Sequence, residues 1–216
     1  MSLFLQRCQG RGVIAFAISE AEISARLGDH YAPGMITATD EYALRAMDQS
    51  LKCAAVLIPL VCKQDGWHLL LTRRTDVVAT HKGQVSFPGG ACDAAETTAE
   101  STALREAEEE IGLAPADVRL LGRLNDVATI THYRVTPVVG AIPWPYPFRL
   151  APMEVARIFS IPLAWLAEPN HWSEAPFNLG GARRAVPVVT YQEYDGEILW
   201  GVSARIVLNF LSVLGN

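Results

Sequence analysis

Acidic side chains gather between residues 93 and 110, where seven carboxylates accompany a single basic residue, Arg105. The spacing predicts a helix over Thr97–Ile111, with an apolar stripe buried and the opposite side facing outward. Around that helix Glu110 lies at about +40° and Glu109 at about −60° from Glu106, so these three project from one side. The seven acidic residues are Asp93, Glu96, Glu100, Glu106, Glu108, Glu109 and Glu110.

Carboxylates at these spacings repel one another by roughly a few tenths of a kcal/mol per pair, and Arg105 relieves only part of that repulsion. A divalent cation would relieve the rest. Oxygen ligands without His or Cys on the same helix favour Mg²⁺ or Mn²⁺ over zinc. Glu106 and Glu110 are the first choice as ligands, with Glu109 as a third. For the helix considered alone, a solvated acidic face without a ligand is the more common explanation.

A glycine-containing segment, Phe87-Pro88-Gly89-Gly90, precedes the helix and predicts a tight turn. Neither glycine carries a β-carbon, so the backbone can approach a neighbouring group closely. Basic side chains before this turn form a local cationic group in an acidic protein. Cations beside metal-binding carboxylates suit a polyphosphate substrate, although each could instead be a solvated strand end or loop residue. The basic residues are Arg73, Arg74, His81 and Lys82.

The composition indicates one folded domain with an elaboration, since the chain has 216 residues, of which 50% are hydrophobic and 19% charged. The net charge of −5 gives no global basic field, so neither nucleic acid nor an anionic membrane is expected as a partner. The longest apolar run, Cys53–Cys62, is about half as long as the ~20 residues of a membrane span. Four cysteines without a C-x-x-C pair fit reduced thiols in a reducing cytosol, so we expect a cytoplasmic protein.

Residues 1–50 are expected to form an N-terminal elaboration packed on the core, and residues 51–216 the main domain. Ser19 can cap a helix over Glu20–Leu27 that Gly28 would end, and Asp40–Met47 resembles a second helix. Strands with interspersed helices predict a mixed α/β or α+β domain. The expected strands are Cys53–Cys62, Trp67–Thr72, Val85–Phe87, Arg119–Asn125, Val135–Ile142, Val155–Ile161 and a hairpin of Val186–Gln192 with Ile198–Trp200; Pro143–Pro152 is expected as a loop, and further helices over Leu163–Ala167 and from Ser203 to Leu214.

The segment from Gly90 to Leu113 resembles the signature of Nudix hydrolases. That signature runs Gly, then Glu, then Arg-Glu-apolar-x-Glu-Glu-x-Gly-apolar. Gly90, Glu96 and the stretch from Arg105 to Leu113 supply every fixed position. Eight residues rather than seven separate Glu96 from Arg105, an insertion familiar from the coenzyme A pyrophosphatase branch of the family.

A second segment is similar to the same branch. Leu70–Arg74 and Gly83–Gly90 resemble its Leu-Leu-Thr-x-Arg and Gly-x-x-x-Phe-Pro-Gly-Gly elements. Two positions depart from the pattern, because Thr75 stands where Ser or Ala is usual and Ala79 where Arg is usual. The missing Arg bears on the substrate more than on the chemistry. With shorter similarities further on, the resemblance covers roughly residues 50–212.

This resemblance implies the Nudix fold, an α-β-α sandwich of α+β class in which a mixed β-sheet lies between helices. It also implies metal-dependent hydrolysis of a nucleoside diphosphate linked to another moiety. Coenzyme A or its thioesters would give 4′-phosphopantetheine and adenosine 3′,5′-bisphosphate. The alternatives are a Nudix hydrolase for ADP-ribose, an NDP-sugar or an NTP, and a non-catalytic nucleotide-sensing domain.

The resemblance also assigns roles to residues. Arg105 is expected to orient carboxylates by pairing with Glu96 or Glu109, and the general base is open between Glu106 and Glu154, which could equally be a surface acid at the start of a strand. The expected partner is a small-molecule nucleotide, and the oligomeric state is left open, with a homodimer as one alternative. The residues expected to contact substrate are Arg74, Lys82, Gly89 and Gly90.

Overall fold

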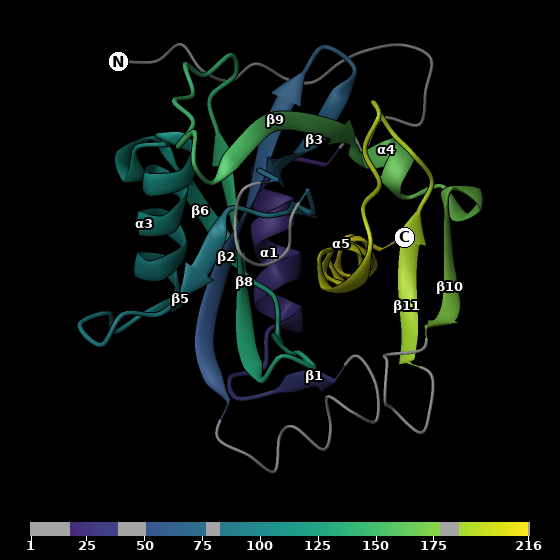
Figure 1. The fold of residues 1–216 in the computed structure, drawn as a ribbon, viewed down its shortest axis with the longest axis horizontal. Helices are drawn as coiled ribbons and strands as arrows, with labels where there is room; N and C mark the ends of the chain where they lie inside the picture. Colours follow the sequence, from purple (N-terminus) through teal and green to yellow (C-terminus); the bar gives the residue numbers. More distant parts are fainter. Residues whose placement is uncertain (1–17, 39–50, 77–82, 178–185, 216) are drawn as a thin grey trace.

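The computed structural model describes residues 18–38, 51–76, 83–177 and 186–215. Its largest element is a mixed β-sheet with the strand order β1-β7-β8-β2-β3-β4, in which β5 also pairs with β2, β6 with β8 and β9 with β3 (Figure 1). The central strand β2 runs parallel to β8 and antiparallel to β3. The described strands of this sheet are β1 (Ile36–Ala38), β2 (Lys52–Lys63), β3 (Gly66–Arg74), β4 (Val85–Ser86), β5 (Gly89–Ala91), β6 (Arg119–Arg123), β7 (Asp126–Ala128), β8 (Tyr133–Ile142) and β9 (Val155–Pro162).

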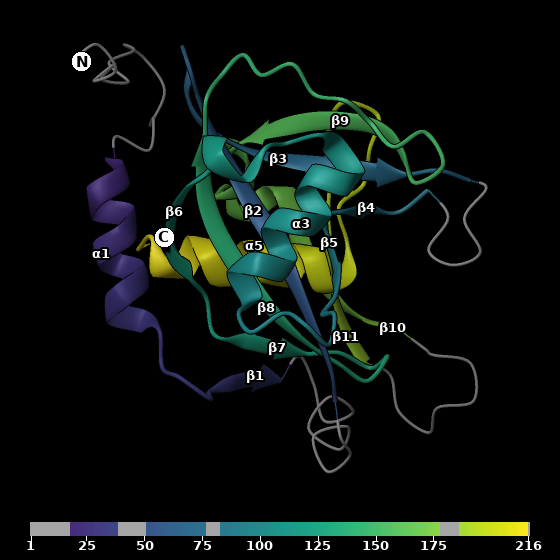
Figure 2. The ribbon, with the colours of Figure 1, turned by 90° about the vertical axis from the view of Figure 1, so that its left-hand side faces the viewer.

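Helices cover both faces of the sheet (Figure 2). Helix α3 (Ala99–Ile111) shares one apolar cluster with β2, β3 and β8, whereas α1 (Glu20–His30) and α5 (Gly201–Val213) share the cluster on the other face. Strand β2 is apolar almost throughout because both of its faces are covered. No helix in the described ranges is both long and apolar enough to cross a membrane. The predicted α-β-α sandwich with a mixed sheet is confirmed.

Residues 18–38 pack against this sheet. The Ser19 hydroxyl accepts a hydrogen bond from the Glu22 N–H (3.2 Å), and the Glu22 carboxylate accepts one from the Ser19 N–H (2.8 Å), so both ends of a capping box are formed. Helix α1 continues to His30, so its predicted end at Gly28 is wrong; a single glycine costs a helix only about 1 kcal/mol. The helix predicted over Asp40–Met47 lies outside the described residues.

The C-terminal strands pair differently from the prediction. Strand β11 (Val186–Tyr191) pairs along its whole length with β10 (Trp172–Phe177), a strand that the sequence did not indicate because Pro176 interrupts its apolar pattern. The predicted hairpin with Ile198–Trp200 is confirmed in part. The Tyr191 N–H donates to the Leu199 carbonyl (2.8 Å), but the returning segment pairs through isolated antiparallel bridges, Thr190 with Trp200 and Tyr194 with Glu197, and does not form a regular strand. Helix α5 begins at Gly201, so the predicted cap at Ser203 is wrong. A short helix α4 (Leu163–Leu166) follows Pro162.

Cys53 and Cys92 form a disulfide. Ala54 pairs with Ala91 in the antiparallel ladder of β2 and β5, so the next residues outward, Cys53 and Cys92, face each other with their Cα atoms 5.4 Å apart. The expectation of reduced thiols is therefore wrong for this pair. Their separation of 39 residues along the chain gives no sign of the contact, which depends on β5 folding back onto β2.

Candidate active site

Helix α3 is fixed at both of its ends. The Thr98 hydroxyl accepts a hydrogen bond from the Ser101 N–H (3.2 Å), and Gly112 ends the helix with a φ of 66°, a conformation that glycine adopts without steric cost. The helix packs on the sheet through four buried residues, and this packing sets the directions in which its carboxylates project. These buried residues are Thr102, Ala103, Ala107 and Ile111.

The three carboxylates predicted to share one exposed side have different surroundings. The Glu109 side chain is 60% exposed, the Glu106 side chain is 17% exposed and the Glu110 side chain is only 6% exposed. The buried Glu110 carboxyl group lies beside Arg74 and accepts a backbone hydrogen bond from Gly89 of β5. The prediction of a uniformly exposed acidic side is therefore wrong at Glu110, since helix geometry alone carries no information about residues distant along the chain.

Arg105 contacts several acidic partners at once. Its Nε donates to Glu96 Oε1 (2.8 Å), its Nη1 to Glu109 Oε2 (2.9 Å), and its Nη2 lies 2.9 Å from Glu106 Oε1. Nη2 also donates to the Ala91 carbonyl at the end of β5 (3.1 Å). The sequence predicted a contact with Glu96 or Glu109, and Arg105 makes both. A guanidinium held in this way fixes where the Glu106 carboxylate lies relative to β5.

Glu96 is the partner of Arg105 that accepts the most hydrogen bonds from other residues. Besides Arg105 it accepts hydrogen bonds from the Asp93 N–H (2.8 Å) and the Thr102 hydroxyl (2.7 Å). The hydrogen bond from Arg105, together with these two, lowers the pKa of Glu96 to about 2. The same contacts raise the pKa of Arg105. Glu96 therefore stays ionised and ties the loop before α3 to the first half of the helix.

Gly89 and Gly90 lie in strand β5 rather than in the predicted turn, with Gly89 opposite Val56 and Gly90 opposite Ala55 of β2. A β-carbon on Gly90 would lie 2.5 Å from Cδ of Glu106, and one on Gly89 would lie 2.5 Å from the Ala55 carbonyl oxygen. The prediction of a turn is wrong because the edge of β2 offers β5 a hydrogen-bonding partner. The close backbone approach predicted for these glycines is present.

Burial and neighbouring negative charge oppose ionisation of the Glu106 and Glu110 carboxyl groups. Burial raises the pKa of Glu110 to about 8, an effect that Arg74 opposes and that the charges of Glu106 and Glu154 increase. Burial also raises the pKa of Glu106, against the opposing effect of Arg105. Arg74 Nη1 lies 3.7 Å from Glu110 Oε1, and Arg74 Nε is buried without a hydrogen-bond partner among the described residues. The site thus combines crowded carboxylates with one cation that has unused hydrogen-bonding capacity.

Glu154 reaches the same place from the loop before β9. Its charge acts on both Glu106 and Glu110, although it lies far from them along the chain. Glu154 is exposed, and its carboxylate makes no hydrogen bond or ion pair with any residue that the structure describes. Glu106, Glu110, Glu154, Arg74 and the two glycines of β5 therefore gather at one site. Lys82, His81 and Ala79 lie outside the described residues.

Comparison with known proteins agrees with this arrangement. Residues 51–176 match the NUDIX domain. This chain belongs to the Nudix hydrolase family. A curated relative, "Uncharacterized Nudix hydrolase NudL" of Escherichia coli strain K12, is 40% identical over 163 residues, which cover 75% of this chain and 82% of the relative. The chain is therefore a pyrophosphohydrolase of nucleoside diphosphate derivatives, and Nudix hydrolases generally use divalent metal ions.

Solved Nudix structures overlap this one over part of their length. RenU of M. smegmatis gives a TM-score of 0.46 at 24% identity and covers 54% of this chain and 74% of its own. The NUDIX domain of Shewanella oneidensis NrtR, solved with ADP ribose, gives a TM-score of 0.41 at 17% identity, with 65% of this chain and 83% of that domain covered.

The donor set of this Nudix site fits a hard divalent ion with few protein ligands. Among the described residues no three His, Cys, Asp or Glu side chains are grouped closely enough to hold an ion by themselves. Mg²⁺ usually takes only one or two carboxylates and completes its shell with water and substrate phosphates. Glu106 and Glu110 match that requirement, because the two carboxylates lie close together. Their closeness is seen in the charge of Glu106, which raises the pKa of the buried Glu110. The Glu109 carboxylate is turned toward Arg105.

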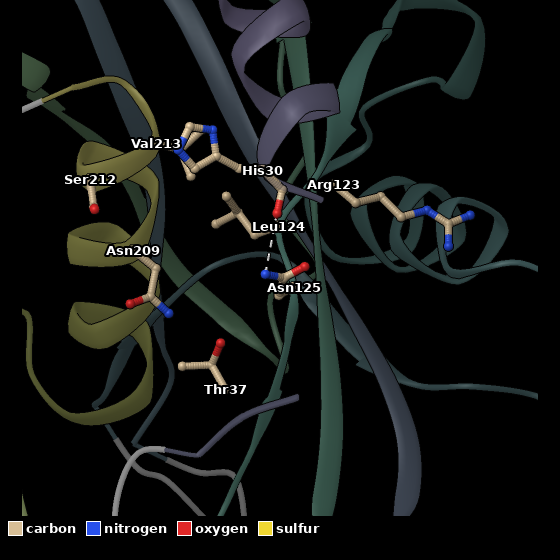
Figure 3. Close-up of a pocket in the computed structure, with 8 residues that line it drawn as sticks. All are labelled: His30, Thr37, Arg123, Leu124, Asn125, Asn209, Ser212 and Val213. Carbon is tan, nitrogen blue, oxygen red and sulfur yellow. Dashed lines mark hydrogen bonds between the residues drawn. The ribbon is translucent and has the colours of Figure 1, made fainter. Parts of the chain in front are cut away.

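A separate pocket lies between α1, the segment before β7, and α5 (Figure 3). The Asn125 side chain accepts a hydrogen bond from the Ala32 N–H (2.9 Å) and donates one to the His30 carbonyl (3.4 Å). Arg123 points away from the pocket toward Glu100. No carboxylate is among its described lining residues, so this pocket lacks the groups that hydrolysis of a phosphoanhydride needs. Its lining residues are His30, Thr37, Arg123, Leu124, Asn125, Asn209, Ser212 and Val213.

Sequence reasoning missed one residue at the edge of the site. Thr75 is buried, and its hydroxyl and its amide both bond to the backbone that carries Glu154. The sequence singled it out only as a departure from a family pattern. Its partners lie far along the chain, so the position of Thr75 beside Arg74 was the only signal that could have drawn attention to it.

Proposed function

We propose that this Nudix hydrolase cleaves the pyrophosphate bond of coenzyme A or its thioesters, with Mg²⁺ or Mn²⁺ as cofactor. The products would be 4′-phosphopantetheine and adenosine 3′,5′-bisphosphate. The observation that carries the hydrolytic part is the pair Glu106 and Glu110, which are crowded together, shielded from water and adjacent to Arg74. The similarity of Leu70–Arg74 and Gly83–Gly90 to the coenzyme A branch supports the substrate.

In this proposal Glu106 and Glu110 hold the metal ion, and Glu109 adds a further negative charge beside them. The ion supplies charge neutralisation for the phosphate oxygens as the anhydride bond breaks. Arg105 keeps Glu106 in place through its contacts with Glu96 and the Ala91 carbonyl. The Glu106 carboxylate thereby stays oriented before substrate arrives, which reduces the reorganisation needed in the transition state.

Glu154 is proposed as the general base, because its carboxylate is exposed and unpaired among the described residues while those of Glu106 and Glu109 are engaged by Arg105. A water molecule attacks one phosphorus and passes its proton to Glu154. The P–O bond to the bridging oxygen breaks, and that oxygen leaves on the other phosphate. Each product then carries one phosphate from the former anhydride.

Arg74 is proposed to bind a phosphate of the substrate. Its buried Nε has no hydrogen-bond partner in the part of the chain that the structure describes, and the distance of 3.7 Å between Nη1 and Glu110 leaves room for a stronger, charge-assisted hydrogen bond. Lys82 is the second cation proposed for the nucleotide phosphates. Gly89 and Gly90 are proposed to contact the substrate through the backbone of β5.

A product screen tests the substrate. The protein is incubated with Mg²⁺ and, separately, coenzyme A, ADP-ribose, NADH and dATP, and the products are separated by chromatography. We expect adenosine 3′,5′-bisphosphate from coenzyme A, and no product from the Glu110→Gln protein under the same conditions. Rapid turnover of ADP-ribose without adenosine 3′,5′-bisphosphate would reject the coenzyme A assignment. Binding without turnover of any of the four would favour the nucleotide-sensing alternative.

We also propose that residues 51–216 form the catalytic domain and that residues 1–50 are an elaboration packed on it. The contacts of residues 18–38 support this division, since Arg119 of β6 pairs with Glu20 (2.7 Å) and the Trp67 indole N–H donates to the Ile18 carbonyl (2.8 Å). None of these contacts involves a residue proposed for the site. A chain lacking residues 1–50 should therefore lose stability while any folded fraction keeps its specificity in the same screen.

A further inference from the structure

Thr75 is the first residue after β3, and it bonds twice to the backbone that carries Glu154. Its N–H donates to the Glu154 carbonyl (2.9 Å), and its hydroxyl donates to the Met153 carbonyl (2.9 Å). Thr75 itself is only 8% exposed, so water competes little for these bonds. Two adjacent carbonyls of one turn are thus held by a single residue.

The pairing of β3 with β9 explains why the contact occurs at this point. Arg73 pairs with Arg157, but Arg74 pairs with Val155, so the register shifts by one residue just before Thr75. A shift of this kind bends the strand and redirects the residues that follow it. The turn that precedes β9 consequently lies over the end of β3.

The turn before β9 is also hydrogen-bonded to helix α3. The Glu154 and Val155 N–H groups both donate to the Ala151 carbonyl (2.9 Å each), and the Ala151 N–H donates to the Glu110 carbonyl (2.8 Å). A continuous chain of hydrogen bonds therefore runs from Thr75 through this turn to Glu110. The backbone of Glu154 is fixed, while its carboxylate is left free to act.

We propose that Thr75 is a positioning residue for Glu154, and that its hydroxyl keeps the Glu154 carboxylate beside Glu106 and Glu110. The inference rests on the proposed function, in which Glu154 accepts the proton of the attacking water. Arg74 contacts Glu110 through its side chain, so residues 74 and 75 together place two of the acidic groups of the site. Loss of the hydroxyl should move the base without altering the metal ligands or the phosphate contacts.

The test compares Thr75→Val, which keeps the shape and removes the hydroxyl, with Thr75→Ser, which keeps the hydroxyl. Activity is measured on whichever of coenzyme A, ADP-ribose, NADH and dATP the wild-type protein hydrolyses fastest. We expect Thr75→Val to lower kcat about 10- to 100-fold with KM within about twofold, since a displacement of about 1 Å can cost that much. Thr75→Ser should restore most of the rate.

A double-mutant cycle separates positioning from general destabilisation. In a Glu154→Gln background, Thr75→Val should lower kcat no further, because there is no base left to misplace. Thr129→Val is the matched control: the Thr129 hydroxyl accepts from the Tyr133 N–H (3.0 Å) in another turn, so its loss should lower stability but give the same fold-change in both backgrounds. Amide exchange in residues 151–155 should quicken in Thr75→Val and remain slow in Thr75→Ser.

The outcomes distinguish a failure of the role proposed for Thr75 from a failure of the role proposed for Glu154. If Glu154→Gln lowers kcat but Thr75→Val does not, or if their effects multiply, Thr75 is not a positioning residue and the proposed function stands. Unchanged amide exchange in the turn of Thr75→Val would overturn the inference in the same way. If Glu154→Gln retains the wild-type kcat, or no substrate is hydrolysed, the proposed role of Glu154 is wrong and the inference falls with it.

Discussion

Gly90 lies directly against the carboxyl group of Glu106. A β-carbon at position 90 would be 2.5 Å from Cδ of Glu106, well inside contact distance, whereas one at position 89 would be 2.5 Å from the Ala55 carbonyl oxygen and 2.6 Å from the Val56 Cα. The two neighbouring glycines therefore serve different purposes. Gly90 leaves space for a functional side chain, and Gly89 leaves space for the backbone of β2.

Gly90→Ala should reduce activity much more than stability. The atoms that the new methyl group meets are at the end of a flexible side chain, so Glu106 can move aside at little cost in folding free energy. Its carboxylate would then be displaced by about 1 Å or more, and kcat should fall about a hundredfold. Steady-state kinetics and urea unfolding of the same preparation check both parts.

Gly89→Ala is the matched comparison, and it should behave in the opposite way. Here the methyl group meets backbone atoms that cannot rotate away, and Gly89 has a φ of 157° that other residues rarely adopt. We expect a loss of about 1–3 kcal/mol in the free energy of unfolding. Equal losses of stability in the two variants would show that Glu106 does not lie against Gly90 in solution.

The fold could be predicted from the sequence where the signals are local. The apolar run Cys53–Cys62 indicated a strand, which is present as β2, and α3 begins within two residues of its predicted start. A tight turn between Lys63 and Gly66 joins β2 to β3, which contains the strand predicted over Trp67–Thr72. Each of these depends on neighbours within a few positions along the chain.

The surroundings of the acidic residues could not be predicted, because residues distant in sequence create them. Glu110 is buried beside Arg74 and Gly89, and Glu106 is confined by Gly90. Helix geometry placed the two on one side of the helix but contained nothing about what covers them. The Cys53–Cys92 disulfide was missed for the same reason, since it depends on the register of β5 against β2.

Glu110→Gln should lower kcat by at least about a hundredfold, since a lost metal ligand removes several kcal/mol of transition-state stabilisation. Without metal, the same variant should be at least as stable as the wild type, because burial of an ionised carboxylate is unfavourable and the Gln side-chain oxygen can still accept the backbone hydrogen bond from Gly89. Unfolding in urea with EDTA, and then with added Mg²⁺, measures this. Near-normal turnover by the variant would remove Glu110 from the proposed ligands.

Glu96→Gln should change how stability depends on pH. The pKa of Glu96 is lowered from 4.5 to about 2 in the folded protein, so its ionised form stabilises the fold fully above pH 4.5 and loses that effect as the pH falls toward 2. The difference in unfolding free energy between wild type and variant should therefore shrink steadily from pH 5 to pH 3. Glu193→Gln, at an exposed position away from Arg105 and Glu96, controls for the loss of one charge. A difference that does not vary with pH would contradict the Arg105–Glu96 contact.

Reduction of the Cys53–Cys92 disulfide should destabilise the protein and loosen the site. A bond that closes a loop of this length contributes about 2–4 kcal/mol by restricting the unfolded chain. It also holds the segment just after Ala91, whose carbonyl accepts a bond from Arg105, so kcat should fall along with stability.

Urea unfolding with and without dithiothreitol measures the first effect, and kinetics under the same conditions measure the second. Cys53→Ser should match the reduced wild type in both, and dithiothreitol should then shift its stability by less than the wild-type loss. Mass spectrometry of unreduced digests should find the peptides containing Cys53 and Cys92 joined. If those peptides are separate and both thiols react with iodoacetamide in the native protein, β5 is held on β2 by its hydrogen bonds alone, and the reductant should leave activity unchanged.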